Sequence, residues 1–361
     1  MLKFRENIQK MTTYSPPLEG RSEKPYLLLD FNERTVEPGL KVKEALKDFV
    51  EQGRLRVYPE YGDLEEKIAL YAGVENNQAI ATNGADQAID IICRSHLGEG
   101  DKVIIPSPSF PMYGQSALCQ AAVILEPPYK QDGSFPIDEV LEMLNKEGRV
   151  RLVILCNPNN PLGATIKLEA LEKILQLAQE KEIAVLHDEA YFEFSGLTAK
   201  NLIVKYDNLY IVRTFAKAFG LVATRIGYAL SQEANLRELL KIRGPYDVNM
   251  FAKTAVLAAL SDTGYVADYV SEVMGKAKPR LEKFLAGKGI FFFPSSANFL
   301  FLPMRDAKGA AEALRQQNIL VRPKKGPENQ EGLRISIGEE KDIAKLISAF
   351  DSLPLDIFGA K

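Results

Sequence analysis

The sequence has little of the residue types that build disulfide frameworks and metal centres: among its 361 residues there are three cysteines and two histidines, and no tryptophan. Cys93, Cys119 and Cys156 are an odd number at wide spacing, so no disulfide framework is expected and the cytoplasm is the expected location. His96 and His187 occur without CxxC or HxxxH spacing, so no metal site is expected. His187 precedes two carboxylates, and we predict a hydrogen-bonded histidine at a strand end rather than a metal ligand.

The sequence also lacks the features of membrane and nucleic-acid-binding proteins. No apolar run reaches the roughly 20 residues that a transmembrane helix needs, and residues 1–7 contain no apolar signal core. The net charge of −3 gives no reason to expect nucleic acid or a membrane surface as a partner. No G-x-G-x-x-G follows an expected strand and no G-x-x-x-x-G-K-[ST] is present, which disfavours nicotinamide and P-loop nucleotide binding.

Short apolar runs alternate with amphipathic segments through the first two thirds of the chain. The runs predict strands at 79–82, 101–105, 123–125, 151–156, 183–186 and 209–212. The amphipathic segments predict helices at 42–50, 64–71, 87–97, 137–144 and 168–181. This alternation is typical of a parallel α/β sheet, in which the functional site lies at the carboxyl edge.

The pattern changes after Gly227. Here we predict helices at 236–242, 251–260, 266–285 and 310–317 and strands at 291–294, 298–302, 319–322 and 332–338. Residues 1–30 carry little periodicity and are rich in turn formers around Pro16 and Pro17, which indicates an extended arm that packs on a partner subunit. The predicted organisation is an N-terminal arm (1–35), a large α/β domain (36–245) and a smaller α+β domain (246–361).

Unusual polar residues follow the expected strands. Lys217 comes after the strand at 209–212, and a desolvated lysine there loses its proton easily and can form a Schiff base with a carbonyl group. Gly84 turns the chain into a helix whose first amides form an anion site, and Arg225 is a second candidate for binding an anionic group. Arg334 interrupts an apolar strand with no acidic neighbour in that strand, so a ligand anion is one candidate partner.

The loop at 106–113 follows the strand at 101–105. Either Phe110 or Tyr113 in this loop could stack on a planar ring, and core packing is the alternative for both.

Taken together, these segments resemble a fold-type-I, pyridoxal-phosphate-dependent aminotransferase of class I/II, and they are most similar to the histidinol-phosphate aminotransferases. The matching segments occur in the family's order at 58–60, 83–86, 157–163, 188–191, 217–221, 225–228 and 333–338. The resemblance implies a three-layer, aspartate aminotransferase-like large domain with a mainly parallel sheet and a smaller α+β C-terminal domain. It also implies pyridoxal 5'-phosphate as cofactor and a homodimer.

The resemblance assigns the cofactor site residue by residue. Lys217 resembles the lysine that binds the cofactor and moves a proton, and Asp188 resembles the carboxylate that pairs with the pyridine nitrogen. Asn160 and Tyr191 resemble the donors to the phenolic oxygen, and Phe110 resembles the residue stacked on the ring. The phosphate cup is implied at Ala85, Asp86, Thr214 and Arg225, with Tyr58 contributed from the partner subunit.

The resemblance implies that Arg334 takes the anionic group of the substrate and that Arg322, Tyr14 and Asn32 line the substrate pocket. Four positions depart from the family's pattern. Ala216 stands where a serine is common, Leu162 replaces a frequent threonine, Arg34-Thr35-Val36 replaces a proline- and glycine-rich continuation, and Phe110 lacks a tyrosine hydroxyl.

The predicted activity is amino-group transfer between L-histidinol phosphate and 2-oxoglutarate or glutamate, a step of histidine biosynthesis. The alternative is an aromatic amino acid (Tyr/Phe) aminotransferase on the same scaffold. A threonine-phosphate decarboxylase on the same scaffold is less favoured because of the Lys217-Ala218-Phe219-Gly220 segment. A non-catalytic PLP-fold binding protein is less favoured because Lys217, Asp188 and Arg225 are all retained and the N-terminus is too short and not basic enough for a DNA-binding domain.

Overall fold

A seven-stranded sheet forms the centre of the larger unit in the computed structural model, which describes residues 2–351 and 353. Its strand order is β2-β8-β7-β6-β5-β3-β4, in which only β8 runs antiparallel to its neighbours. The strands are β2 (Ala79–Thr82), β3 (Lys102–Ile104), β4 (Val123–Leu125), β5 (Val150–Cys156), β6 (Ala184–Asp188), β7 (Leu209–Thr214) and β8 (Gly227–Leu230).

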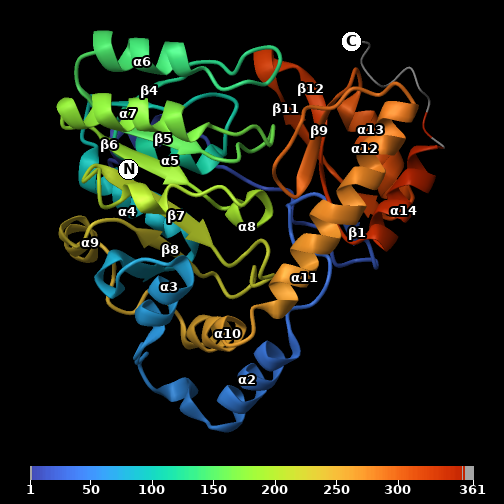
Figure 1. Cartoon of the computed structure of the whole chain (residues 1–361), viewed down its shortest axis with the longest axis horizontal. Coiled ribbons are helices and arrows are strands. Elements are labelled where there is room, and N and C mark those ends of the chain that lie inside the picture. The colour runs from blue at the N-terminus through green and yellow to red at the C-terminus, as the bar shows by residue number, and fades with distance from the viewer. Residues whose placement is uncertain (1, 352, 354–361) are drawn as a thin grey trace.

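Helices cover both faces of this sheet, as Figure 1 shows. Successive residues of β7 illustrate why: Leu209 and Ile211 join one apolar cluster, whereas Tyr210 and Val212 join the other. The first cluster includes side chains of α3 (Leu64–Ala72), α6 (Ile137–Lys146) and α7 (Leu168–Glu180). The second includes side chains of α4 (Gly84–His96), α5 (Pro111–Cys119) and α9 (Glu233–Leu240).

A second unit is built on a three-stranded antiparallel sheet of order β11-β12-β9, at the right of Figure 1. Its strands are β9 (Phe299–Pro303), β11 (Arg322–Lys325) and β12 (Glu331–Ser336). The helices around it are α11 (Gly264–Glu272), α12 (Lys278–Gly287), α13 (Ala307–Gln316) and α14 (Glu340–Phe350), and a π-helical turn at Val273–Ala277 joins α11 to α12. The remaining helices are α2 (Leu40–Glu51), α8 (Phe192–Ser195) and α10 (Met250–Leu260).

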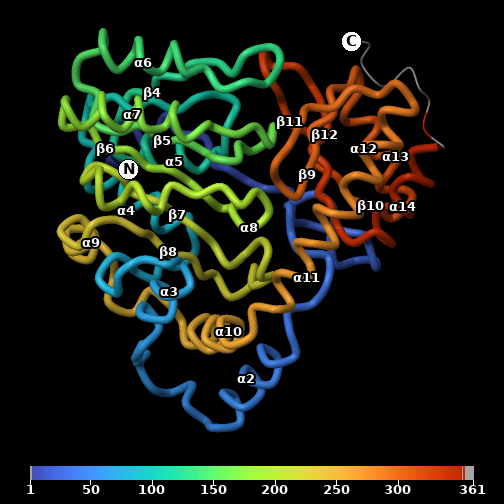
Figure 2. Tube along the Cα trace, in the orientation of Figure 1, coloured from blue at the N-terminus to red at the C-terminus, as the bar shows by residue number. Residues whose placement is uncertain are grey.

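The N-terminal segment connects the two units (Figure 2). Its short helix α1 (Glu6–Lys10) lies against α5, where Asn7 donates a hydrogen bond to the carbonyl of Leu118 (2.8 Å). Further along, β1 (Leu27–Leu28) pairs in parallel with β10 (Ile319–Leu320) of the second unit. The arm therefore contacts both units of its own chain, and its packing on a partner subunit stays a prediction.

The structure corrects three details of the sequence-based prediction. Residues 291–294 are not a strand, because Pro294 has no N–H for a ladder and the run instead places Phe293 in a buried aromatic cluster with Phe301. Residues 111–113 are not loop but the first turn of α5, where Pro111 occupies a helix-starting position. Helix α4 begins at Gly84, three residues before the predicted start.

The predicted α/β class with a mainly parallel sheet and a smaller additional sheet is confirmed. The domain boundaries at residues 35 and 245 stay predictions. Within residues 2–351 and 353, no helix combines the length and the apolar character that crossing a membrane requires.

Candidate active site

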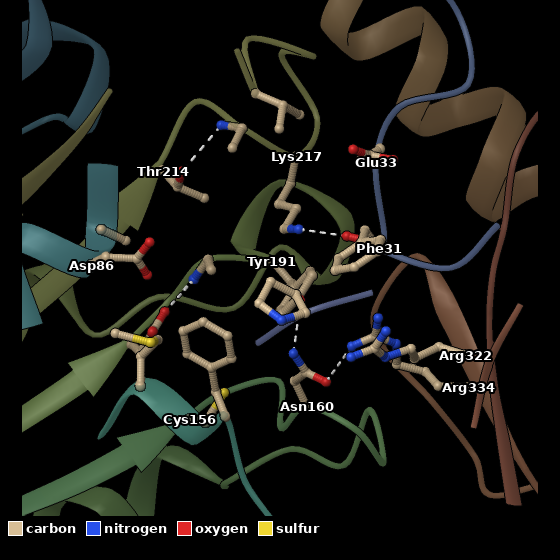
Figure 3. Close-up of a pocket in the computed structure, with 18 of the residues that line it drawn as sticks. Phe31, Glu33, Asp86, Cys156, Asn160, Tyr191, Thr214, Lys217, Arg322 and Arg334 are labelled. Carbon is tan, nitrogen blue, oxygen red and sulfur yellow. Dashed lines mark hydrogen bonds between the residues drawn. The ribbon is translucent and has the colours of Figure 1, made fainter. Parts of the chain in front are cut away.

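A cavity of about 610 Å³ opens where strands β5, β6 and β7 end in Cys156, Asp188 and Thr214. All the site residues predicted from the sequence line it, except Tyr58 and Asn32. The predicted residues in its wall are Tyr14, Ala85, Asp86, Phe110, Asn160, Asp188, Tyr191, Thr214, Lys217, Arg225, Arg322 and Arg334. Figure 3 shows Lys217 and Tyr191 at its centre, between Asp86 on one side and the two arginines on the other.

Lys217 is held at the cavity by the N-terminal arm. Its Nζ donates a hydrogen bond to the backbone carbonyl of Phe31 (2.8 Å) and forms no ion pair within the described residues. Burial, and next the positive charge of Arg334, lower the pKa of Lys217 to about 8. A substantial fraction of this amine is therefore neutral and nucleophilic near physiological pH.

Asp188 faces the same cavity from the end of β6. Its Oδ2 accepts a hydrogen bond from the Tyr113 hydroxyl (2.7 Å) and its Oδ1 accepts one from the backbone N–H of Ala190 (2.9 Å). Burial raises the pKa of Asp188 to about 6, although these two hydrogen bonds act in the opposite direction. This buried carboxylate has no cation partner within the described residues, so a protonated nitrogen placed in the cavity would stabilise its charged form.

Two amides converge on the Tyr191 hydroxyl. Asn160 Nδ2 donates to it at 3.2 Å and Asn32 Nδ2 donates at 3.0 Å. Because this oxygen already accepts two hydrogen bonds, its own proton is free to be donated elsewhere. Asn32 lies behind Tyr191, is fully buried, and is fixed there by Ser336; a direct contact between Asn32 and substrate stays a prediction.

One end of the cavity is suited to an anion. Helix α4 begins there, so its first amide groups have no partners within the helix. Arg225 lies beside this helix start, with Nη2 3.1 Å from Asp86 Oδ2. Position 84 favours glycine because its φ is +74°, a left-handed conformation that L side chains rarely adopt. A Cβ at Gly227 would lie 2.6 Å from the amide nitrogen of Ala85.

The opposite end of the cavity is also cationic. Arg334 is buried and donates to Asn160 Oδ1 (2.8 Å) and to the carbonyl of Asp30 (2.5 Å), while its Nε has no partner within the described residues. Arg322 stands directly opposite Arg334 in the β11–β12 ladder and lies over the Phe31 ring, with its Cζ 5.0 Å from the ring centroid. Tyr14 from the arm also hydrogen-bonds with Arg322.

Of two further predicted cofactor residues, Phe110 lines the cavity and Tyr58 does not. Phe110 lines the cavity and meets the Tyr113 ring edge-on at a centroid distance of 5.6 Å. Tyr58 lies outside the cavity of its own chain: it is 75% exposed and packs on Tyr246. Its predicted contribution to a partner's site stays a prediction.

His187 does not face the cavity. Its Nδ1 lies 3.2 Å from Glu189 Oε1 and its Nε2 lies 3.2 Å from Asn157 Nδ2, so this histidine is hydrogen-bonded at a strand end, as predicted. No cluster of three or more potential metal-ligating side chains occurs within residues 2–351 and 353.

Sequence reasoning missed several groups at the cavity. Tyr113 was considered for ring stacking, but its hydroxyl holds Asp188. Phe31 contributes the backbone carbonyl that accepts from Lys217, and a sequence carries no signal for such a contact. Lys324 lines the cavity and could have been found, because it shares a strand face with Arg322 at a spacing of two residues.

The departure at Leu162 has a structural reason. Leu162 is fully buried in an apolar cluster with Tyr129, Phe293 and Phe301, so it joins the asparagine-proline loop to the second unit. The neighbouring Gly163 approaches Ser295 so closely that a Cβ would lie 2.0 Å from its Oγ.

The fold and the site together define a class of protein. The sequence pattern of the family "Aminotransferase class I and II" matches residues 24–350, and the chain belongs to this family. The chain superposes on the Thermus thermophilus aspartate aminotransferase crystallised with maleate with a TM-score of 0.79, at 22% identity, covering 97% of this chain and 99% of that one.

Further relatives carry the name histidinol-phosphate aminotransferase. The chain is 34% identical over 331 residues to a histidinol-phosphate aminotransferase of Thermoanaerobacter pseudethanolicus, which covers 91% of this chain and 93% of the relative. The structure of the Sinorhizobium meliloti histidinol-phosphate aminotransferase in complex with pyridoxal-5'-phosphate aligns with a TM-score of 0.85 at 24% identity, covering 97% of this chain and 96% of that chain.

The cavity residues fit pyridoxal phosphate. A phosphate matches the helix start beside Arg225, a protonated ring nitrogen matches the buried Asp188 carboxylate, and a carbonyl carbon matches the weakly basic Lys217. Glycine at position 84 leaves room for Arg225 at the helix start, and glycine at position 227 leaves the amide nitrogen of Ala85 uncovered.

Proposed function

We propose that this protein is a pyridoxal-phosphate-dependent transaminase that moves an amino group between L-histidinol phosphate and 2-oxoglutarate or glutamate in histidine biosynthesis. The observation that carries the proposal is the buried Arg334, which faces the cavity without an acidic partner in the described chain. An anionic substrate group would supply the missing partner. Relatives at 34% and 32% identity carry the name histidinol-phosphate aminotransferase.

When bound, pyridoxal phosphate supplies an electron sink that stabilises negative charge at the substrate's α-carbon. The neutral amine of Lys217 would act as the nucleophile toward a carbonyl carbon and then carry a proton on Nζ. Asp188, oriented by Tyr113, would hold a proton on the ring nitrogen. Tyr191 and Asn160 would donate to the phenolic oxygen, and Phe110 would pack on the ring.

The two cationic ends of the cavity would take different anions. The cofactor's phosphate would lie at the start of α4, bound by Arg225, Thr214 and the amides of Ala85 and Asp86. The substrate's phosphate, or the carboxylate of glutamate, would lie at Arg334 and Arg322. The cavity thus separates two anionic groups at opposite ends of the reacting centre, with Lys217 between them.

A homodimer is part of this proposal. Tyr58 is 75% exposed and Leu55 is 61% exposed on the same segment, and Tyr246, which packs on Tyr58, is 55% exposed. Such exposed apolar groups favour a protein partner. We also propose the cytoplasm as location, since all three cysteines lie in the described chain and none forms a disulfide.

The test is a titration of the holoenzyme's visible absorbance with L-histidinol phosphate, L-phenylalanine and L-glutamate in parallel. We expect the band of the bound cofactor to be lost at a much lower concentration of histidinol phosphate than of phenylalanine. The opposite order would identify an aromatic amino acid aminotransferase, and failure to form any band with pyridoxal phosphate would overturn the enzyme assignment. Light scattering would test the dimer.

A further inference from the structure

We propose that Lys324 is a third cation of the substrate's anion site and makes this site selective for a doubly charged phosphate over a singly charged carboxylate. This inference rests on the proposed function, which it extends to the charge of the group that is recognised. The resemblance implied Arg334 as the partner of the substrate's anionic group and Arg322 as a pocket residue, and it did not include Lys324.

Strand geometry places the three cations together. Arg322 and Lys324 are two residues apart on β11, so their side chains leave the same face of the strand. Arg334 on β12 is the direct cross-strand partner of Arg322, whereas Lys324 faces Gly332, which has no side chain. All three cations line the cavity that contains Lys217.

None of the three cations forms an ion pair within residues 2–351 and 353, and the hydrogen-bond acceptors of Arg334 are an amide oxygen and a backbone carbonyl. The nearest carboxylates, Asp30 and Glu33, share the single cation Arg21, and Asp30 also acts on Arg322 and Arg334 through its charge. Four cations therefore face two carboxylates here, which leaves a surplus of positive charge.

Like charges on facing strand positions repel one another, and burial strengthens the repulsion. Burial, followed by the charges of Arg334 and Arg322, lowers the pKa of Lys324 to about 8. A carboxylate brings one negative charge to such a cluster, whereas a phosphate monoester brings about −1.5 to −2 near pH 7. A phosphate thus relieves more of the repulsion and offers three oxygens as acceptors for three donors.

The neighbouring Lys325 is a solvent-exposed lysine on the same strand and provides a comparison for Lys324. It is exposed, leaves the opposite face of β11, stands across from Glu331, and does not line the Lys217 cavity. Lys325→Met therefore removes the same charge from the same strand and serves as a matched control for Lys324→Met.

The first experiment measures steady-state KM values of the holoenzyme for L-histidinol phosphate and L-glutamate in the wild type, Lys324→Met, Lys324→Arg and Lys325→Met. We expect the ratio of the two KM values, histidinol phosphate over glutamate, to rise about tenfold in Lys324→Met, the size of one lost charge-assisted contact. Lys324→Arg should restore the ratio in large part, and Lys325→Met should leave it within twofold of the wild type. An unchanged ratio in Lys324→Met, or an equal change in Lys325→Met, would overturn the inference.

The second experiment separates this inference from the proposed function. Inorganic phosphate is tested as a competitive inhibitor of whichever amino donor the holoenzyme accepts. We expect Lys324→Met, but not Lys325→Met, to raise the inhibition constant of phosphate about tenfold. If the wild type does not use histidinol phosphate, the proposed function fails, while this comparison still decides the role of Lys324. Equal inhibition constants of phosphate in all variants would reject the proposed role of Lys324.

Discussion

The two faces of strands β6 and β7 carry buried charges in opposite states of pairing. On the cavity side, Lys217, Asp188 and Arg334 form no ion pair within the described chain. On the far side, Glu189 and Arg213 are bonded directly, with Arg213 Nη2 2.8 Å from Glu189 Oε2. Asp188 and Glu189 are adjacent residues at the end of β6 and both are buried, so burial alone does not distinguish the two groups of charges.

The far side forms a complete hydrogen-bond network. Glu189 also contacts His187 and accepts from the N–H of Ala199, while Arg213 donates to Thr198. Burial by itself would raise the pKa of the Glu189 carboxyl, but the charge of Arg213 and the His187 ring outweigh it and lower this pKa to about 2. Charges that satisfy one another can be buried without a ligand, whereas charges left without partners in a cavity are available to one.

Lys217 gives the largest expected functional effect. Lys217→Ala should abolish transamination, because no other described amine takes its position at the cavity's centre. The free energy of unfolding should not fall, since the variant removes a desolvated amine that has no ion-pair partner. Steady-state assays and urea unfolding measure the two quantities, and full activity in this variant would remove the cofactor assignment.

Substitution of Glu189, in contrast, should lower the stability of the fold. Glu189→Ala leaves Arg213 buried without its partner, and we expect the free energy of unfolding to fall by about 3–5 kcal/mol, the usual cost of breaking a buried pair. The double variant Glu189→Met/Arg213→Met removes both charges together and should lose much less stability. Urea unfolding of both variants makes the comparison, and equal losses in the two would contradict the pairing argument.

Substitution of Arg334 tests whether an unpaired charge in the cavity binds the substrate. Arg334→Ala should weaken the binding of anionic substrates more than tenfold, since a charge-assisted hydrogen bond contributes roughly 1.5–3 kcal/mol. Arg334→Met, which retains more of the side-chain volume, should weaken binding similarly while destabilising the fold less than Arg334→Ala does. KM values and urea unfolding test this, and an unchanged KM would reject the assignment of Arg334.

Glu193 gives the smallest expected effect on activity, because it does not line the cavity. Burial raises the pKa of Glu193 to about 8, and its Oε2 has no partner within the described chain. Between an unfolded pKa near 4.5 and the folded value of about 8, the folded state keeps a proton that the unfolded state has released, so stability falls as pH rises through this window. Glu193→Gln imitates the protonated carboxyl, so it should match the wild type near pH 5 and be more stable near pH 9. Parallel pH profiles of thermal unfolding in the two proteins would contradict this.

Much of the larger unit was predictable because its strands are buried on both faces and read as continuous apolar runs. The strands that end in Cys156, Asp188 and Thr214 were located within two residues at their carboxyl ends, and that edge is where the polar residues gather. Strand β8 and helix α14 were not predicted. The strand expected at 291–294 was wrong, since aromatic packing and strand pairing give the same apolar signal.

By itself, the sequence determined the order of elements and the chemical character of the residues after each strand, because both follow from local periodicity and residue type. Only the tertiary structure decided which charges are paired. It placed Asp188 in the cavity and Glu189 behind it, joined Arg322, Lys324 and Arg334 across two strands, and brought the Phe31 carbonyl to Lys217. These relations depend on strand register and on contacts between distant segments, neither of which local sequence encodes.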